Sequence, residues 1–365
     1  MHAVTLLAAI RPRLSDGPVA LATVLEVGGS VPRRPGAMMA VSRQPSGGAD
    51  FSAPLLPGPH GTLEAGTVGG GAMEGRILAA MHTRALADVV DQNPMPERLD
   101  IDLHGTPDEV RDGICGGTMR IEVRTLLPRD ASAIDHLIEL GAAGEAAVVS
   151  ADAGGLAVGR LEAIDGGASG AEDKTRVAAG SSVASAGVFA ATAAGWRHTI
   201  APRPLALVVG GGHCGIALAR QLLTLEFDVV VEDDRADVRD RLRAVLPSAV
   251  QVVAGPTHET LTMCAGQRPV HAALVTRSFR QDVDALDALR RTGASSIGVM
   301  GSRRRLGTVL GLLRERGWTA EATEALDAPI GVDLRAETPE EIAVSIAAEL
   351  IEHRASGAVR FPPAD

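Results

Sequence analysis

The stretch LALVVGGGHCGIALARQLL, residues 205–223, contains the strongest structural signal in the chain. An apolar run of strand length leads into a G-x-G-x-x-G turn at Gly210, Gly212 and Gly215, and a helical pattern of apolar residues follows at once. A second apolar run, DVVVEDD, begins at Asp228 after a short connection. This order of strand, glycine turn, helix and strand predicts a βαβ unit of a parallel sheet.

The rest of the C-terminal half continues this alternation. The apolar runs QVVAG and HAALVT precede a helical pattern over residues 282–291. The apolar run SSIGVMG precedes a second helical pattern over residues 303–316. The last helix begins at a capping box, with Thr338 as N-cap, Pro339 at the first helical position and Glu341 three residues after the cap. We therefore predict an α/β domain over residues 201–365, a Rossmann-like doubly wound parallel sheet.

The N-terminal half has a different pattern, which predicts an α+β domain over residues 1–162. Its expected elements are a helix near residues 3–14, a strand over 19–27, a helix over 73–91, and a hairpin that runs from 120–127 into AAVVSA and LAVGRL. The segment that follows is rich in Gly, Ala and Ser and has no sustained period. We expect residues 163–200 to be a linker or loop region.

Composition excludes several classes of function. The chain has 365 residues, of which 45% are hydrophobic, so it can bury more than one core. Its net charge of −10 repels a polyanion, and nucleic acid is therefore not an expected partner. The apolar runs are shorter than the roughly 20 residues of a spanning helix, and no basic region precedes the first of them. We expect a cytoplasmic protein without a membrane span.

The cysteines limit the redox chemistry of the chain. There are three, Cys115, Cys214 and Cys264, and no two of them form a CxxC pair. A disulfide framework or a thiolate metal site therefore has little support. An iron–sulfur cluster ordinarily needs four protein ligands, which these cysteines do not supply.

The glycine turn predicts a nucleotide site at the carboxyl edge of the parallel sheet. Backbone amides at the helix start, beside Gly210, Gly212 and Gly215, suit a pyrophosphate. Asp233 follows the second strand, where a carboxylate bonds a ribose hydroxyl, and Glu232 or Asp234 takes that place if the register differs. The alternative is that the glycines only permit close packing of strand and helix. On this alternative, His213 and Cys214 in the turn are packing or capping groups.

Three further segments follow strands or open helices at the same edge. They are Thr276, Arg277 and Asp282 after HAALVT; Gly301, Ser302 and Arg303 after SSIGVM; and Gly331 and Asp333 before the capped helix. Arginines at helix starts suit anionic ligands. A solvated basic surface explains Arg304 and Arg305 equally well.

A second glycine-rich segment, GTVGGGAMEG, occupies residues 66–75 and contains five glycines and one carboxylate. Together with other blocks in a fixed order, it gives the chain a close resemblance to the XdhC/CoxI family. Only the region around residues 154–199 matches none of the family's motifs. The other blocks are GSVPRRPGAMMAV at 29–41, CGG at 115–117, VVGGGHCGIALA, VEDDR, VTRSFRQDVDAL, IGVMGSRRR and PIGVDLRAETPEEIAVSI.

The resemblance implies an accessory protein of molybdenum hydroxylases such as xanthine dehydrogenase. Such a protein binds molybdenum cofactor, supports its sulfuration and inserts it into the apo-enzyme. The resemblance also implies a cofactor-associated N-terminal domain, a C-terminal Rossmann domain, a homodimer, and a cysteine desulfurase as a further partner. The client enzyme carries the iron–sulfur clusters, which agrees with the small number of cysteines in this chain.

The resemblance places the cofactor site in the N-terminal domain. Gly69, Gly70 and Gly71 supply backbone donors, Glu74 contacts the pterin, and Ser30, Arg33 and Arg34 meet the phosphate. Glu74 alternatively complements the positive end of its helix.

Cys115, followed by Gly116, is the candidate thiol for a molybdenum contact or a sulfur relay, with a buried structural role as its alternative. Some family members carry a cysteine after the triple glycine, where this chain has Ala72. If that thiol is the metal contact in the family, this chain must use Cys115 or lack a thiolate contact.

Two other classes of function fit part of the sequence. An NAD(P)-dependent oxidoreductase would use the glycine turn and Asp233, with His213 or the loop from Thr276 to Asp282 for proton transfer. It would bind and turn over NAD(P)H without a partner. A regulatory nucleotide sensor would bind a nucleotide without any turnover.

Overall fold

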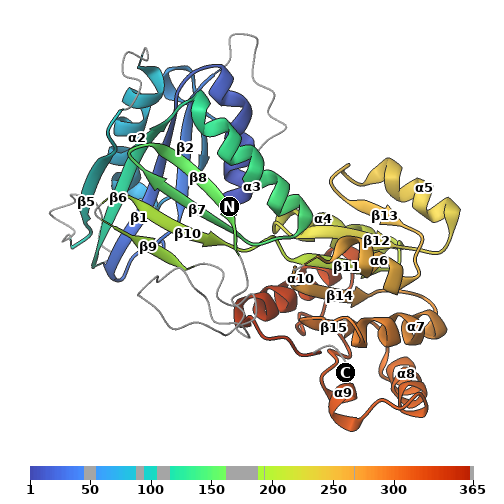
Figure 1. The fold of residues 1–365 in the computed structure, drawn as a ribbon. Coiled ribbons are helices and arrows are strands. Elements are labelled where there is room, and N and C mark those ends of the chain that lie inside the picture. The colour runs from blue at the N-terminus through green and yellow to red at the C-terminus, as the bar shows by residue number, and fades with distance from the viewer. Residues whose placement is uncertain are drawn as a thin grey trace, which may run out of the picture. The chain divides into compact units, whose positions relative to one another are not determined.

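The structure is a computed structural model in which residues 1–44, 55–87, 94–104, 116–161, 188–192, 194–266 and 268–361 are described. The chain forms two compact units, and the main boundary between them falls between Ala201 and Pro202. The first unit contains two antiparallel sheets and the second contains one parallel sheet (Figure 1). This mixed α/β architecture confirms the predicted fold class.

The larger sheet of the first unit has six strands in the order β3-β4-β2-β1-β6-β5. Each pair of neighbours in it is antiparallel. The strands are β1 (Val19–Gly29), β2 (Met38–Arg43), β3 (Leu56–Gly58), β4 (Thr62–Gly66), β5 (Glu97–Asp102) and β6 (Gly117–Leu126).

Both faces of this sheet are buried because alternate residues of β1 enter two different cores. Ala20 and Val24 pack with Ile77 and Met81 of α2 (Gly71–Leu86). Leu21 and its neighbours on the other face pack with α1 (Ala3–Ile10), α3 (Ala131–Ala143) and the second sheet. The alternation that a two-faced strand requires is therefore present in VALATVLEV.

The second sheet contains residues that the sequence analysis assigned to the linker. Its order is β8-β7-β10-β9, with β7 (Ala147–Asp152), β8 (Gly155–Arg160), β9 (Phe189–Ala191) and β10 (Trp196–Ile200). Strand β10 pairs with β7 along its whole length. The expected linker therefore ends earlier than residue 200, because Trp196 and Ile200 supply apolar surface to the core that their sheet covers.

The predicted hairpin is also different in the structure. Strands β7 and β8 form a hairpin, but β6 lies in the six-stranded sheet and α3 separates it from β7. The helix presents Ile134, Leu137 and Leu140 to the core at helical spacing.

The second unit contains a five-stranded parallel sheet in the order β13-β12-β11-β14-β15. Its strands are β11 (Leu205–Val209), β12 (Asp228–Glu232), β13 (Gln251–Val253), β14 (Val270–Leu274) and β15 (Ser296–Val299). The chain proceeds outward from β11 in both directions, which is the Rossmann arrangement predicted from residues 205–234.

Helices cover both faces of this sheet (Figure 1). One face packs on α4 (His213–Thr224), α5 (Ala236–Val245) and α10 (Pro339–Ser356). The opposite face packs on α6 (Thr257–Cys264), α7 (Phe279–Arg290) and α8 (Arg303–Glu315), and α9 (Ala320–Glu324) follows α8. None of the helices in the described ranges combines the length and the apolar character that a membrane crossing requires.

Candidate functional site

Glycine segments from distant parts of the sequence meet at one end of the six-stranded sheet. Gly28 and Gly29 at the end of β1 pair with Thr118 and Gly117 at the start of β6. A Cβ on Gly117 would lie 2.5 Å from the carbonyl oxygens of both Gly28 and Ser30. No larger residue fits without moving backbone atoms, so this close approach requires glycine.

The triple glycine before α2 has two different roles in the structure. A Cβ on Gly69 would collide with Met73 and lie 3.3 Å from Pro32, so Gly69 permits packing between the two loops. Gly70 and Gly71 are exposed and have open space where a Cβ would be, and so does Gly116. We define these three residues as the open glycines. Their backbone groups are accessible to a ligand.

Glu74 lies in the first turn of α2 and is bonded to the preceding loop. The Thr67 hydroxyl is 2.7 Å from Glu74 Oε2 and 2.7 Å from the Gly69 carbonyl oxygen. The Gly69 N–H donates to the same hydroxyl at 3.1 Å. Glu74 therefore fixes the shape of the glycine loop, which sequence reasoning did not anticipate.

A cavity of about 650 Å³ adjoins the glycine loop through Pro32, which lines the cavity and is close to Gly69. We call it the arginine cavity because the exposed side chains of Arg33 and Arg34 line it. Ser30 is exposed and directly precedes this lining segment. The three residues that were predicted to meet a phosphate therefore lie on one loop, which adjoins the glycine loop at Gly69.

His198 of β10 lines the same cavity, although it was expected to lie in the linker. Its ring packs on Gly36, where a Cβ would come within 2.8 Å of the ring. Burial, assisted by the nearby His2, lowers the pKa of His198 to about 4. The residue was missed because its place in the cavity depends on the pairing of β10 with β7.

The candidate thiol Cys115 lies outside the described residues, as does the rest of segment 105–115. Cys214 and Cys264 are free and half-buried. Burial raises the pKa of the Cys214 thiol, with a further contribution from Glu340, and burial also raises the pKa of Cys264. Both are therefore poor nucleophiles at neutral pH.

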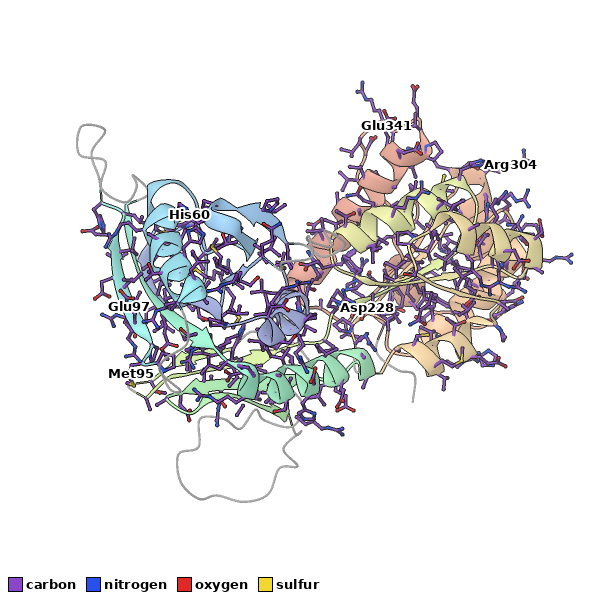
Figure 2. All side chains as sticks on the ribbon, turned by 90° about the horizontal axis from the view of Figure 1, so that it is seen from above. His60, Met95, Glu97, Asp228, Arg304 and Glu341 are labelled. Carbon is purple, nitrogen blue, oxygen red and sulfur yellow. The ribbon has the colours of Figure 1, made fainter. Side chains whose placement is uncertain are left out.

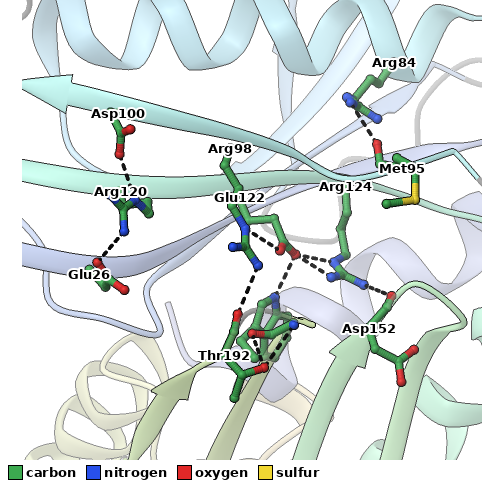
Figure 3. Close-up of polar contacts among 12 residues, drawn as sticks. Glu26, Arg84, Met95, Arg98, Asp100, Arg120, Glu122, Arg124, Asp152 and Thr192 are labelled. Atoms are coloured by element: carbon green, nitrogen blue, oxygen red, sulfur yellow. Dashed lines mark hydrogen bonds and ion pairs between the residues drawn. The ribbon is translucent and has the colours of Figure 1, made fainter.

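A buried ion pair joins the two sheets of the first unit (Figure 3). Glu122 of β6 has no exposed surface and accepts hydrogen bonds from Arg124 and from Trp196 Nε1, the latter at 3.0 Å. Arg124 Nη1 donates to the Asp152 carbonyl at 3.1 Å, and Arg98 Nη2 donates to the Thr192 carbonyl. Opposite charges two residues apart on one strand were the available sequence signal for this cluster.

In the second unit, the G-x-G-x-x-G turn connects β11 to α4 as predicted. A Cβ on Gly215 would lie 2.0 Å from the Gly210 carbonyl oxygen, so close packing of strand and helix requires this glycine. Gly212 faces open space, and His213 is exposed at the first position of the helix. The turn thus combines the packing role with a backbone that a ligand can approach.

Asp233 does not have the free carboxylate that the sequence analysis assigned to it. Its Oδ2 accepts from the Gly211 N–H at 2.8 Å and from Arg235 Nη2 at 2.8 Å, while Oδ1 accepts from the Arg235 N–H and Nε. Burial tends to raise its pKa, but these bonds outweigh burial and lower the pKa to about 2. The carboxylate ties the glycine turn to the end of β12 instead of facing a ribose.

A second polar cluster lies at the carboxyl ends of β14 and β15. Asp282 is fully buried and accepts from the Thr276 hydroxyl at 2.6 Å and from Arg305, whose Nη1 also donates to the Thr276 carbonyl at 2.8 Å. Arg305 is therefore an internal partner. Arg304 projects away from the unit (Figure 2).

Gly301 and Arg303 flank the start of α8, where Ser302 is the N-cap and accepts from the Arg305 N–H at 3.4 Å. These residues follow β15, and the glycine turn follows β11, with β14 between the two strands. The predicted residues of the second unit therefore share one edge of the parallel sheet.

The fold and these sites define a two-unit protein in which a glycine-rich antiparallel unit precedes a Rossmann unit. Two family models match the chain: XdhC and CoxI family over residues 13–90, and XdhC Rossmann domain over residues 206–350. The chain belongs to the XdhC and CoxI family.

Relatives and a solved structure are consistent with this family. The chain is 32% identical over 164 residues to the uncharacterized protein YqeB of Escherichia coli K12, covering 44% of this chain and 30% of that protein. It is 27% identical over 160 residues to a protein of Bacillus subtilis 168 named as a probable xanthine dehydrogenase subunit, covering 44% of this chain and 46% of that protein. The chain thus spans less than half the length of these relatives.

A crystal structure of a protein from Bacillus halodurans, named a xanthine dehydrogenase, superimposes with a TM-score of 0.68 at 20% identity. The superposition covers 98% of this chain and 96% of that one. The likeness shows that the two proteins share a fold.

Proposed function

We propose that this protein binds molybdenum cofactor in its first unit, supports its sulfuration, and inserts it into a molybdenum hydroxylase of the xanthine dehydrogenase type. Membership of the XdhC and CoxI family supports an accessory role. The structural observation that carries the proposal is that the loop with Gly70 and Gly71 adjoins the arginine cavity, because Gly69 lies close to Pro32 of the cavity lining.

The chemistry of the cargo matches this position. Molybdopterin has a phosphate, a polar pterin and a metal-bound dithiolene, so its host needs cationic groups, backbone hydrogen-bonding groups and one polar side chain. Arg33 and Arg34 meet the phosphate, the backbone of Gly70 and Gly71 approaches the pterin, and Glu74 binds ring nitrogens with the oxygen that Thr67 leaves open. Cys115 precedes the open glycine Gly116 in sequence and is the proposed thiol contact.

Retention of isolated molybdenum cofactor tests the site. The purified full-length chain is passed through an ultrafilter with cofactor, and molybdenum and pterin are quantified in the retained fraction. We expect near-stoichiometric retention by the wild type and a loss of about tenfold or more in affinity for Arg33→Gln/Arg34→Gln, because two charge-assisted contacts are removed. Arg160→Gln, which removes an exposed arginine of β8, is the matched control.

Glu74→Gln and Thr67→Val separate two roles of the loop. The glutamine keeps an oxygen for the Thr67 hydroxyl but loses the charge that binds the pterin, whereas the valine removes only the loop contact. Weaker retention by Glu74→Gln than by Thr67→Val supports a direct pterin contact. Absence of retention by the freshly prepared wild type contradicts the proposal.

Transfer to a client is a separate measurement. Loaded protein is mixed with an apo molybdenum hydroxylase of the xanthine dehydrogenase type, with sulfide or a cysteine desulfurase as the sulfur source. We expect hydroxylase activity to appear faster than with free cofactor, and Cys115→Ala both to weaken retention and to slow the appearance of activity, because it removes the proposed thiol contact. Equal rates with and without the chain contradict the insertion role.

A further inference from the structure

A dinucleotide site that binds the hydroxyls of an unmodified adenosine ribose has a free carboxylate after the second strand. The carboxyl edge of this Rossmann unit differs at Asp233. A carboxylate offers about four positions for hydrogen-bond donors, and Asp233 receives four donated bonds, one from Gly211 and three from Arg235. The residue is 1% exposed. A ribose hydroxyl at the end of β12 therefore has no open acceptor on Asp233.

Glu232, the last residue of β12, is also engaged inside the fold. It is buried, and its two oxygens accept from the hydroxyls of Thr257 at 2.8 Å and Thr260 at 3.0 Å. Burial raises the pKa of its carboxyl group. Two of the three consecutive carboxylates at the end of β12, Glu232 and Asp233, are thus used inside the fold.

The hydrogen bonds that occupy the Asp233 carboxylate also hold the Arg235 guanidinium in place. Nε and Nη2 bond the carboxylate, the side chain keeps 38% of its surface exposed, and no acceptor within the described ranges is bonded to its Nη1. In a Rossmann domain the end of this strand lies beside the adenosine ribose, and an arginine there accommodates a 2′-phosphate. A fixed guanidinium is well suited to a phosphate because little side-chain freedom is lost on binding.

Two further charged residues lie near Arg235. Arg239 adds a positive charge, and Asp234 is a second group that could contact the ribose. Arg239 is one turn further along α5, and its Nη1 donates to the carbonyl oxygens of Asp233 and Asp234 at 2.9 and 2.7 Å. Asp234 has a side chain that is 74% exposed, and it is the carboxylate that remains open to a ribose hydroxyl. The identity of the ligand therefore depends on whether Arg235 or Asp234 contacts the ribose.

The other end of the same edge offers an aromatic surface. Phe279 begins α7 shortly after β14 and is 42% exposed, and it is the only exposed Phe or Trp within the described residues. Arg277 is exposed two residues earlier. An aromatic ring next to a cation at the ligand edge suits a planar ring and its phosphate.

We infer that the Rossmann unit binds a dinucleotide with a phosphate on its adenosine ribose, and that Arg235 recognises this phosphate. NADP(H) is the dinucleotide class that carries this group. The inference does not depend on the proposed cofactor site, which lies in the other unit.

The experiment compares 2′,5′-ADP with 5′-AMP, which differ only by the 2′-phosphate on the ribose, by calorimetric titration of the full-length protein. We expect the wild type to bind 2′,5′-ADP about tenfold or more tightly, and NADPH more tightly than NADH in the same ratio. Arg235→Gln removes the cation and frees Asp233, so it should bring the two affinities to within about threefold of each other. Arg243→Gln, which removes an arginine from the last turn of α5, should keep the wild-type preference.

Asp234→Asn tests the alternative ribose contact. On our inference this variant keeps the preference for 2′,5′-ADP. Tighter binding of 5′-AMP by the wild type, with loss of that preference in Asp234→Asn, overturns the inference. Equal affinities, absence of binding of both probes, or an unchanged preference in Arg235→Gln also overturn it.

Discussion

At the scale of single residues, burial determines how much an ion pair contributes. Glu122 and Arg124 lie inside the first unit, where the carboxylate has no exposed surface and the guanidinium is held by Asp152 as well. Arg120, on the same strand β6, pairs with Glu26 and Asp100 in solvent. Water and salt screen the exposed pair, whereas the buried arginine depends on its partner.

Glu122→Ala should therefore destabilise the first unit by about 3–5 kcal/mol, because it leaves the Arg124 guanidinium buried without a counter-charge. Urea unfolding monitored by Trp196 fluorescence measures the effect. Glu26→Ala is the matched control and should change the midpoint little. Equal effects of the two substitutions contradict this account.

At the scale of elements, the ends of helices are specified locally. The Thr338 hydroxyl accepts from the Glu341 N–H at 3.2 Å, and Glu341 Oε2 accepts from the N–H groups of Thr338 and Glu337. The helix that this capping box opens, α10, buries Ile346 and Leu350 against the parallel sheet and its neighbour α4. The cap was predictable from TPEE because its partners lie within four residues.

Thr338→Ala should destabilise the second unit by about 1 kcal/mol, because the Glu341 N–H loses its acceptor at the helix start. Chemical denaturation monitored by Trp318 fluorescence measures the loss. Glu352→Ala, an exposed substitution on the same helix, should have little effect. A cap variant as stable as the wild type contradicts the assigned role.

At the scale of the whole molecule, the two units have separate cores and one tryptophan each, Trp196 and Trp318. Trp318→Phe leaves a probe in the first unit, and Trp196→Phe leaves one in the second. Each unit also contains a half-buried or buried histidine, His198 or His271, whose pKa burial lowers to about 4. The free energy of unfolding of each unit should therefore decrease as the pH is lowered toward the folded-state pKa of its histidine.

His271 makes this linkage testable. Burial, followed by the charges of His353 and Arg354, lowers its folded-state pKa, whereas the unfolded value is about 6.5. As the pH falls from 6.5 to 4 the unfolded chain takes up a proton that the folded chain does not, so the second unit should lose about 2 kcal/mol between pH 7 and 5.

His271→Asn keeps a polar group for Ser296 and removes the titrating ring. Urea midpoints of the second unit at the two pH values should then differ less than in the wild type. His258→Asn, at an exposed position of α6, should retain the wild-type pH dependence. A slope unchanged by His271→Asn contradicts the assignment.

Elements with local signals were predictable from the amino-acid sequence. Residues 205–234 specify the glycine turn and the two parallel strands around it, because strand periodicity, glycine spacing and helix periodicity follow one another without interruption. The resemblance to the family, and not the periodicity, singled out the glycine loop before α2 and the loop that carries Arg33 and Arg34. The order of the motifs also identified the family.

Long-range packing determines which side chains are available at those places. His198 reaches the arginine cavity because β10 pairs with β7, and the Gly211 N–H donates to Asp233 because the glycine turn packs against the end of β12. Neither fact is encoded in a short window, since each depends on strands that are distant in sequence. Local patterns thus indicate where ligands can approach, and the pairing of distant strands selects the groups that meet them.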